Sequence, residues 1–158
     1  MYQRSIFRIC GLAFAGLLAL SGGAVGQGEQ KPAKDLITGN WTLMIADHVR
    51  SDGNKVPGFG PLPQGTAKFG PDGRYSLDLM PNSSSHAALS YSGTYTLDDT
   101  GKTISLRVEE SSQPNWRGKT QTGAVKFITG EHLGWTSSVP LAEAADVTGT
   151  ELIWTRSK

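Results

Sequence analysis

From Gly39 onward, apolar and polar residues alternate with a period of two, in segments of about 6–10 residues. Such alternation places successive side chains on opposite faces, which is typical of β-strands with one buried face. The segments predicted as strands span residues 41–50, 66–69, 74–80, 91–97, 102–110, 120–129, 133–138 and 150–156.

Short connections between these segments have the composition of tight turns. Gly70-Pro71-Asp72-Gly73 and Asp98-Asp99-Thr100-Gly101 each predict a hairpin, because proline suits the first central turn position and glycine accepts a positive φ. Residues 56–64 contain three prolines and predict a long loop. No connection predicts a helix, so neighbours in sequence are expected to be antiparallel neighbours in space.

Eight such strands favour an all-β fold, an eight-stranded antiparallel up-and-down barrel. Closing the sheet pairs the last strand with the first and removes both exposed edges. An open sandwich is the alternative. In a closed barrel of this size the interior is filled by side chains or holds one small ligand.

The first 26 residues have the three parts of a secretory signal peptide. Arg4 and Arg8 precede an apolar run over residues 9–20, and small residues follow it. The alternative is a membrane anchor, but the run is shorter than the roughly 20 apolar residues that span a bilayer. We therefore predict a cleaved signal peptide (1–26), a flexible lead-in (27–36) and an exported, periplasmic or secreted barrel domain (37–158), with no membrane span in the mature chain.

Composition and charge narrow the classes of partner. The 158 residues include 20 Gly, 8 Pro and 18% charged residues, which disfavours a helical bundle. Cleavage after Gly26 lowers Lys plus Arg from 15 to 13 against 14 acidic residues, so the net charge changes from +1 to about −1. A net charge so close to zero offers no basic surface for nucleic acid. The single cysteine, Cys10, leaves with the signal peptide, so no disulfide is expected.

Gly39-Asn40-Trp41 and Arg156 begin the first strand and end the last. They resemble the Gly-x-Trp and terminal Arg pair of the lipocalin and calycin barrels. The resemblance implies that the guanidinium packs on the indole where the first and last strands meet, a cation–π contact of about 0.5–2 kcal/mol. Gly39, Trp41 and Arg156 are therefore the predicted closure residues.

A longer series of motifs resembles the bacterial and fungal lipocalin-like domain family and covers nearly the whole mature chain. Among its elements are Phe59-Gly60-Pro61, Asp72-Gly73-Arg74, residues 91–96, Pro114-Asn115-Trp116-x-Gly118 with Gln121, and Gly130-Glu131-x-Leu133. The family tends to have an arginine shortly after the glutamine, whereas here residues 122–124 are Thr, Gly and Ala. The resemblance implies a cavity more firmly than a chemistry.

The lipocalin resemblance implies that Trp41 points inward, and period two then turns Leu43, Ile45, Asp47 and Val49 inward. An apolar chamber with a few phenol groups is the usual mixture for a small-molecule site. The alternative is that the same aromatic residues fill a solid barrel. The candidate ligand-binding residues are Ile45, Asp47, Phe59, Tyr75, Leu77, Tyr91, Tyr95, Leu106, Trp116, Phe127 and Trp135.

Two of these aromatic residues lie in predicted loops. Phe59, between two glycines, has the position of a lid in lipocalin-like barrels, or is a hydrophobic tether. Trp116 is either a gate or partner contact, or a plug of one barrel end.

Neither a metal nor another cofactor is predicted. His48, His86 and His132 are far apart, without a spacing that would place two ligands on one face. His48 is expected to face outward unless a bulge reverses the register. No Gly-rich loop opens a helix, so a nucleotide phosphate has no predicted site.

Three hypotheses for function follow. The first is an exported barrel that binds a small apolar or amphipathic molecule inside. The second is a metal-free isomerase or cyclase in the same chamber, with Asp47, Tyr75, Tyr95 and Arg107 as polar candidates. The third is an inhibitor-like interaction module that acts through Trp116 and the loops.

Overall fold

The computed structural model describes residues 31–82, 87–140 and 145–158. The predicted signal peptide and His86 therefore lie outside the described residues.

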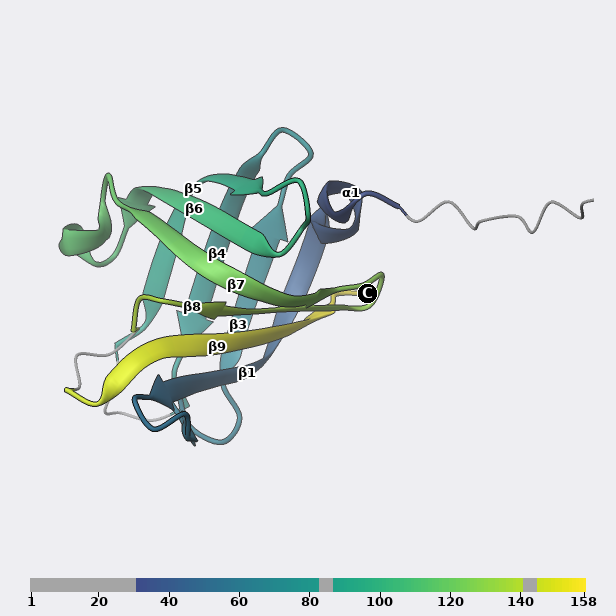
Figure 1. Ribbon diagram of the computed structural model, residues 1–158. Helices are drawn as coiled ribbons and strands as arrows, with labels where there is room; N and C mark the ends of the chain where they lie inside the picture. The colour runs from purple at the N-terminus through teal and green to yellow at the C-terminus, as the bar shows by residue number, and fades with distance from the viewer. Residues whose placement is uncertain (1–30, 83–86, 141–144) are drawn as a thin grey trace, which may run out of the picture.

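The described chain forms a closed antiparallel barrel of eight strands (Figure 1). Each strand pairs with the next along the chain, and the first pairs with the last, which closes the sheet. The all-β barrel predicted from the alternation is therefore confirmed, and the open sandwich is excluded. The barrel strands are β1 (Gly39–Arg50), β3 (Gln64–Phe69), β4 (Arg74–Met80), β5 (Leu89–Leu97), β6 (Thr103–Ser111), β7 (Thr120–Ile128), β8 (His132–Ser137) and β9 (Val147–Arg156).

Three short elements were not predicted. Strand β2 (Lys55–Pro57) pairs along the last residues of β1, within the segment expected to be all loop. Helix α1 (Ala33–Ile37) lies in and just beyond the segment expected to be a flexible lead-in, and η1 (Pro114–Trp116) is a single 3-10 turn. All three are too short to have a recognisable period.

The two ends of the barrel differ. At one end lie α1, the C-terminus and the short turns 70–73, 98–102 and 129–131 (Figure 1). We call it the helix end. The connections at the opposite end, which we call the loop end, are longer and include residues 51–63 and 112–119. Because binding residues concentrate on loops carried by a rigid scaffold, the loop end is where a site is expected.

Four register shifts interrupt the described strand pairs, and two of them change the face on which predicted site residues lie. In β1 the register shifts between Leu43 and Ile45, which leaves Met44 as the extra residue. In β7 it shifts between Val125 and Phe127, where Lys126 is extra. A bulge puts two residues opposite one, so positions beyond it point to the other face.

Candidate functional site

Trp41 and Arg156 close the helix end of the barrel. The two residues are partners in the β1–β9 pair, and the Arg156 guanidinium carbon lies 4.3 Å from the centroid of the Trp41 ring. The same guanidinium donates hydrogen bonds to the carbonyls of Leu36 (2.7 Å), Thr38 (3.1 Å) and Gly130. Trp41 Nε1 donates to the carbonyl of Ile37, which ties α1 to this end.

Aromatic side chains fill the interior next to this closure. Phe69 packs edge-on against Tyr95 and Trp135, with ring centroids 5.0 and 6.2 Å away, and lies stacked on Tyr75 at 6.2 Å. Trp135 stacks on Trp154 at 5.8 Å. Packed aromatic rings therefore line this half of the interior.

Inward-facing side chains become smaller toward the loop end on β3, β8 and β9. The inward series runs from Phe69 to Gly65 on β3, from Trp135 to Ser137 on β8, and from Trp154 to Thr150 on β9. On β1 the inward series runs from Trp41 through Ala46 to His48, so it ends with an imidazole. The loop-end half of the interior is therefore lined by smaller and more polar groups next to β3, β8 and β9.

Phe59 covers part of the loop end. It is 2% exposed, and its ring lies 6.4 Å from the ring of His48. The backbone on both sides is fixed, because the Gly58 N–H donates to the Ala46 carbonyl and the Asn82 N–H donates to the Phe59 carbonyl, both at 2.9 Å. Its position suits the predicted lid.

Trp116, in η1, lies at the same end. It is half-buried, and its ring packs edge-on against Tyr91 with centroids 5.4 Å apart. Tyr91 in turn lies 6.0 Å from Tyr75. An aromatic series thus connects a loop-end residue to the interior.

Three buried polar atoms in the interior have no hydrogen-bond partner among the residues that the structure describes. They are the Tyr75 hydroxyl, Gln121 Nε2 and Trp154 Nε1, on side chains of residues that are 4%, 5% and 0% exposed. Burial raises the pKa of Tyr75, with a smaller contribution from Glu109, so the hydroxyl keeps its proton. Because an unsatisfied buried polar group costs about 1–3 kcal/mol, each is a position where an added hydrogen-bond partner would be stabilising.

The structure places most of the predicted ligand-binding residues in the buried interior, but not all. Ile45 and Asp47 follow the β1 bulge and lie on the outer face, where both are half-buried; Val49 shares that face. The expectation that they point inward is wrong, because the bulge puts Ala46 and His48 inside instead. The predicted residues that belong to the buried core are Phe59, Tyr75, Leu77, Tyr91, Tyr95, Leu106 and Trp135.

The expectation that Phe127 points inward is wrong for the same reason. It follows the β7 bulge and pairs with Gly134, whose neighbours Leu133 and Trp135 both point inward. A Cβ added at Gly134 would lie 2.7 Å from the Phe127 ring, so the ring covers this glycine on the outer face.

The polar candidates for catalysis do not converge. Asp47 lies on the outer face, and Arg107 is exposed on β6. The Tyr95 hydroxyl donates to the Gly70 carbonyl at the helix end (2.9 Å), whereas Tyr75 packs between Phe69 and Tyr91. No two of them share a hydrogen bond among those described.

A buried carboxylate on the outer face was missed by sequence reasoning. Glu151 is 3% exposed and accepts hydrogen bonds from Lys55 on β2 (2.6 Å) and from Lys126 at the β7 bulge. Burial alone would raise the pKa of Glu151, but these two ammonium groups outweigh it and leave the pKa below its ordinary value. Burial, and then the nearby Glu151, raise the pKa of Asp47.

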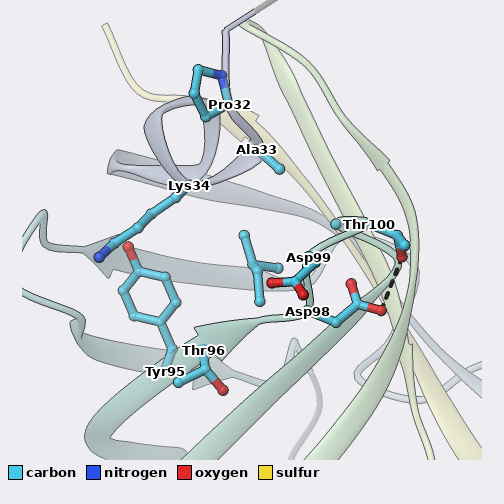
Figure 2. Close-up of a pocket in the computed structure, with 10 residues that line it drawn as sticks. Pro32, Ala33, Lys34, Tyr95, Thr96, Asp98, Asp99 and Thr100 are labelled. Carbon is cyan, nitrogen blue, oxygen red and sulfur yellow. Dashed lines mark hydrogen bonds between the residues drawn. The ribbon is translucent and has the colours of Figure 1, made fainter.

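A separate pocket of about 430 Å³ lies at the helix end, between α1 and the β5–β6 turn. Figure 2 shows Pro32, Ala33 and Lys34 on one side and the Asp98, Asp99 and Thr100 turn on another. The Asp98 carboxylate accepts hydrogen bonds within its own turn, from Thr100 and from the Lys102 and Thr103 N–H groups. The polar groups of this pocket are therefore partly engaged in hydrogen bonds within the β5–β6 turn.

Neither a metal site nor a membrane helix is found in the part of the chain that the structure describes. Within it, no three His, Cys, Asp or Glu side chains are grouped so that they could hold a metal ion. None of the helices in the described segments has the length and apolar character needed to cross a bilayer.

Gln121, Ser137 and Thr150 are interior residues that were not among the predicted site residues. All three are buried. The signal was available for Ser137 and Thr150, because they alternate with Trp135 and with Leu152 and Trp154. These two residues are polar, whereas the alternation pattern identifies interior positions by their aromatic and apolar residues.

The chain is similar to a known protein family and to solved structures. The model of the lipocalin-like domain family matches residues 82–157, which include β5 to β9. No curated protein matches the chain significantly in sequence. Among solved structures, a redesigned β-barrel is 15% identical with a TM-score of 0.46, over 80% of this chain and 96% of its own. The protein EF1p2_mFAP2b bound to DFHBI is 16% identical with a TM-score of 0.42, over 80% and 98%.

Proposed function

Because the chain belongs to the lipocalin-like β-barrel family, we propose that it binds a small apolar or amphipathic molecule in the loop-end half of the barrel. The observation that carries this proposal is the loss of side-chain volume toward the loop end on β3, β8 and β9. Apolar walls with a few polar groups are typical of small-molecule sites. The aromatic half, which includes Tyr75 and Trp154, serves as the floor of the site.

Phe59 and Trp116 support the choice of this end. Phe59 lies beside the inward His48 and Trp116 lies beside Tyr91, so a ligand entering there would meet aromatic surface first. The enzymatic alternative has less support, because its polar candidates lie on different faces and at different ends.

Two alanines offer a matched test. Ala46 is 1% exposed and faces the interior, whereas Ala124 is exposed on the outer face of β7. Binding is measured by titrating the neutral fluorophore N-phenyl-1-naphthylamine and following its emission. We expect Ala46→Leu to weaken binding at least tenfold while Ala124→Leu leaves it unchanged.

The same pair distinguishes a hollow interior from a filled one. If the space is open, Ala46→Leu keeps the unfolding temperature of the unsubstituted protein. In a filled barrel, overpacking lowers the stability by about 1–3 kcal/mol. Such destabilisation together with no saturable binding by the unsubstituted protein would refute the proposal.

We also propose that the protein is exported to the periplasm or secreted. The support is the arrangement of Arg4 and Arg8, the apolar run and the small residues before Gln27. Mass spectrometry of the protein from the producing cells should give a mature chain that begins near Gln27. An intact N-terminus would contradict this.

A further inference from the structure

The unpartnered interior atoms are all hydrogen-bond donors. Trp154 Nε1 and Gln121 Nε2 can only donate, and the Tyr75 hydroxyl retains its proton in the core. Aromatic contacts connect Tyr75 through Phe69 and Trp135 to Trp154, and Trp135 lies against Gly123, the next inward position after Gln121. The three donors therefore belong to one connected set of interior side chains.

That interior has almost no formal charge. Among the described barrel residues, the inward positions carry no Asp, Glu or Lys. Arg156 is at the helix end and is engaged by Trp41 and three carbonyls. His48 adds an imidazole at the loop end, where its ring packs against Phe59. Burying an ion without a partner is costly, so an ammonium ligand would find no carboxylate among these inward positions, and a carboxylate ligand would find an imidazole already packed against Phe59.

We propose that the barrel selects a neutral apolar molecule that carries hydrogen-bond acceptor oxygens, such as a ketone or ester, and binds those oxygens through Tyr75, Gln121 and Trp154. This inference rests on the proposed function and specifies its ligand class. A ligand oxygen that accepts a hydrogen bond from one of these donors removes the cost of leaving that donor unsatisfied. A plain hydrocarbon would leave the donor unsatisfied.

The test uses four probes with the same chain length: dodecane, 2-dodecanone, dodecanoate and dodecylammonium. Each displaces N-phenyl-1-naphthylamine from the purified protein. We expect 2-dodecanone to bind about tenfold more tightly than dodecane, since one hydrogen bond to a buried donor corresponds to that ratio. The two ions should bind more weakly than the ketone.

Variants that delete one donor while keeping its shape identify the residues responsible. Tyr75→Phe and Trp154→Phe remove the hydroxyl and the indole N–H, and Gln121→Leu removes the amide. At least one should reduce the preference for ketone over dodecane severalfold, with dodecane affinity changing less than twofold. Tyr95→Phe is the matched control, because its hydroxyl already donates to Gly70.

The unfolding temperature without ligand gives a second readout. Tyr75→Phe should not lower it, because no bond within the described structure is lost, whereas Tyr95→Phe should. Equal binding of ketone and dodecane, or equal losses of stability in the two variants, would overturn the inference and leave the proposed function standing. If no probe displaces the fluorophore, the proposed function fails and the inference with it.

Discussion

Asp47 and Glu151 lie directly opposite each other in β1 and β9, so two carboxylates share one cross-strand pair on the outer face of the barrel. Like charges in such a pair are destabilising unless other groups compensate them. Here Lys55 and Lys126 hold Glu151 between them, and Asp47 is left with the raised pKa. The arrangement connects β2 and β7 across the β1–β9 closure.

Replacing Glu151 should destabilise the barrel at neutral pH. Glu151→Gln breaks both lysine contacts of a buried carboxylate, and we expect urea denaturation at pH 7 to show a loss of about 1–2 kcal/mol. Because the folded-state pKa of Glu151 is lowered, its contribution is complete above the ordinary value of 4.5 and is lost as the pH falls below it. The difference in stability between the two proteins should therefore shrink as the pH falls below 4.5; a constant difference would contradict the assignment.

Replacing Asp47 should have the opposite effect. Asp47→Asn removes a desolvated carboxylate that faces Glu151, and we expect a gain of about 0.5 kcal/mol at pH 7. The pKa of Asp47 is raised, so the unsubstituted protein recovers this difference as the pH falls through that pKa toward 3.8. Asp99→Asn, an exposed change in the β5–β6 turn, is the control and should leave the stability unchanged across this range.

The stability of the helix end should depend on the shape and hydrogen bonds of the Arg156 guanidinium and not on its charge alone. Arg156→Lys keeps the charge but cannot maintain both the contact with Trp41 and three carbonyl hydrogen bonds. We expect thermal denaturation to show a loss of about 1–2 kcal/mol, with faster hydrogen exchange in α1. Arg74→Lys, which alters an exposed ion pair with Glu109, should cost less than about 0.5 kcal/mol.

Phe59 should control the rate of ligand exchange. Removing its ring with Phe59→Ala uncovers the loop end, so stopped-flow measurements should show association and dissociation of N-phenyl-1-naphthylamine both accelerated severalfold. Leu62→Ala lies in the same connection but is 72% exposed, and it should leave both rates unchanged. If Phe59→Ala changes only the stability, Phe59 is a tether and not a lid.

The barrel could be predicted because its strands alternate regularly and its turns have distinctive residues. Seven of the eight predicted segments, such as 74–80 and 91–97, fall within about two residues of the observed strands at both ends, as expected for boundaries inferred from pattern. Trp41 and Arg156 were recognised as a pair because a family pattern connects the first and last strands. Nothing local to either residue indicates the contact.

The sequence does not predict the face of the sheet on which Ile45, Asp47 and Phe127 lie. A bulge depends on how two strands pair, and it leaves no clear pattern in the sequence of either strand alone. Glu151 was missed for a related reason. Its partners Lys55 and Lys126 come from β2 and from the β7 bulge, and neither element was expected.

The bulge at Met44 has a consequence for how this interior would diverge among related chains. Beyond it, β1 presents Ala46 and His48 to the interior and Ile45 and Asp47 to solvent. Deleting the single codon for Met44 would restore regular pairing between β1 and β9 and leave both sets on their present faces, because Leu43 and Ile45 already pair with the consecutive residues Trp154 and Ile153. The bulge therefore accommodates one extra residue without changing the interior, so a change of chain length at this position would preserve the inward residues, whereas the same change elsewhere in β1 would not.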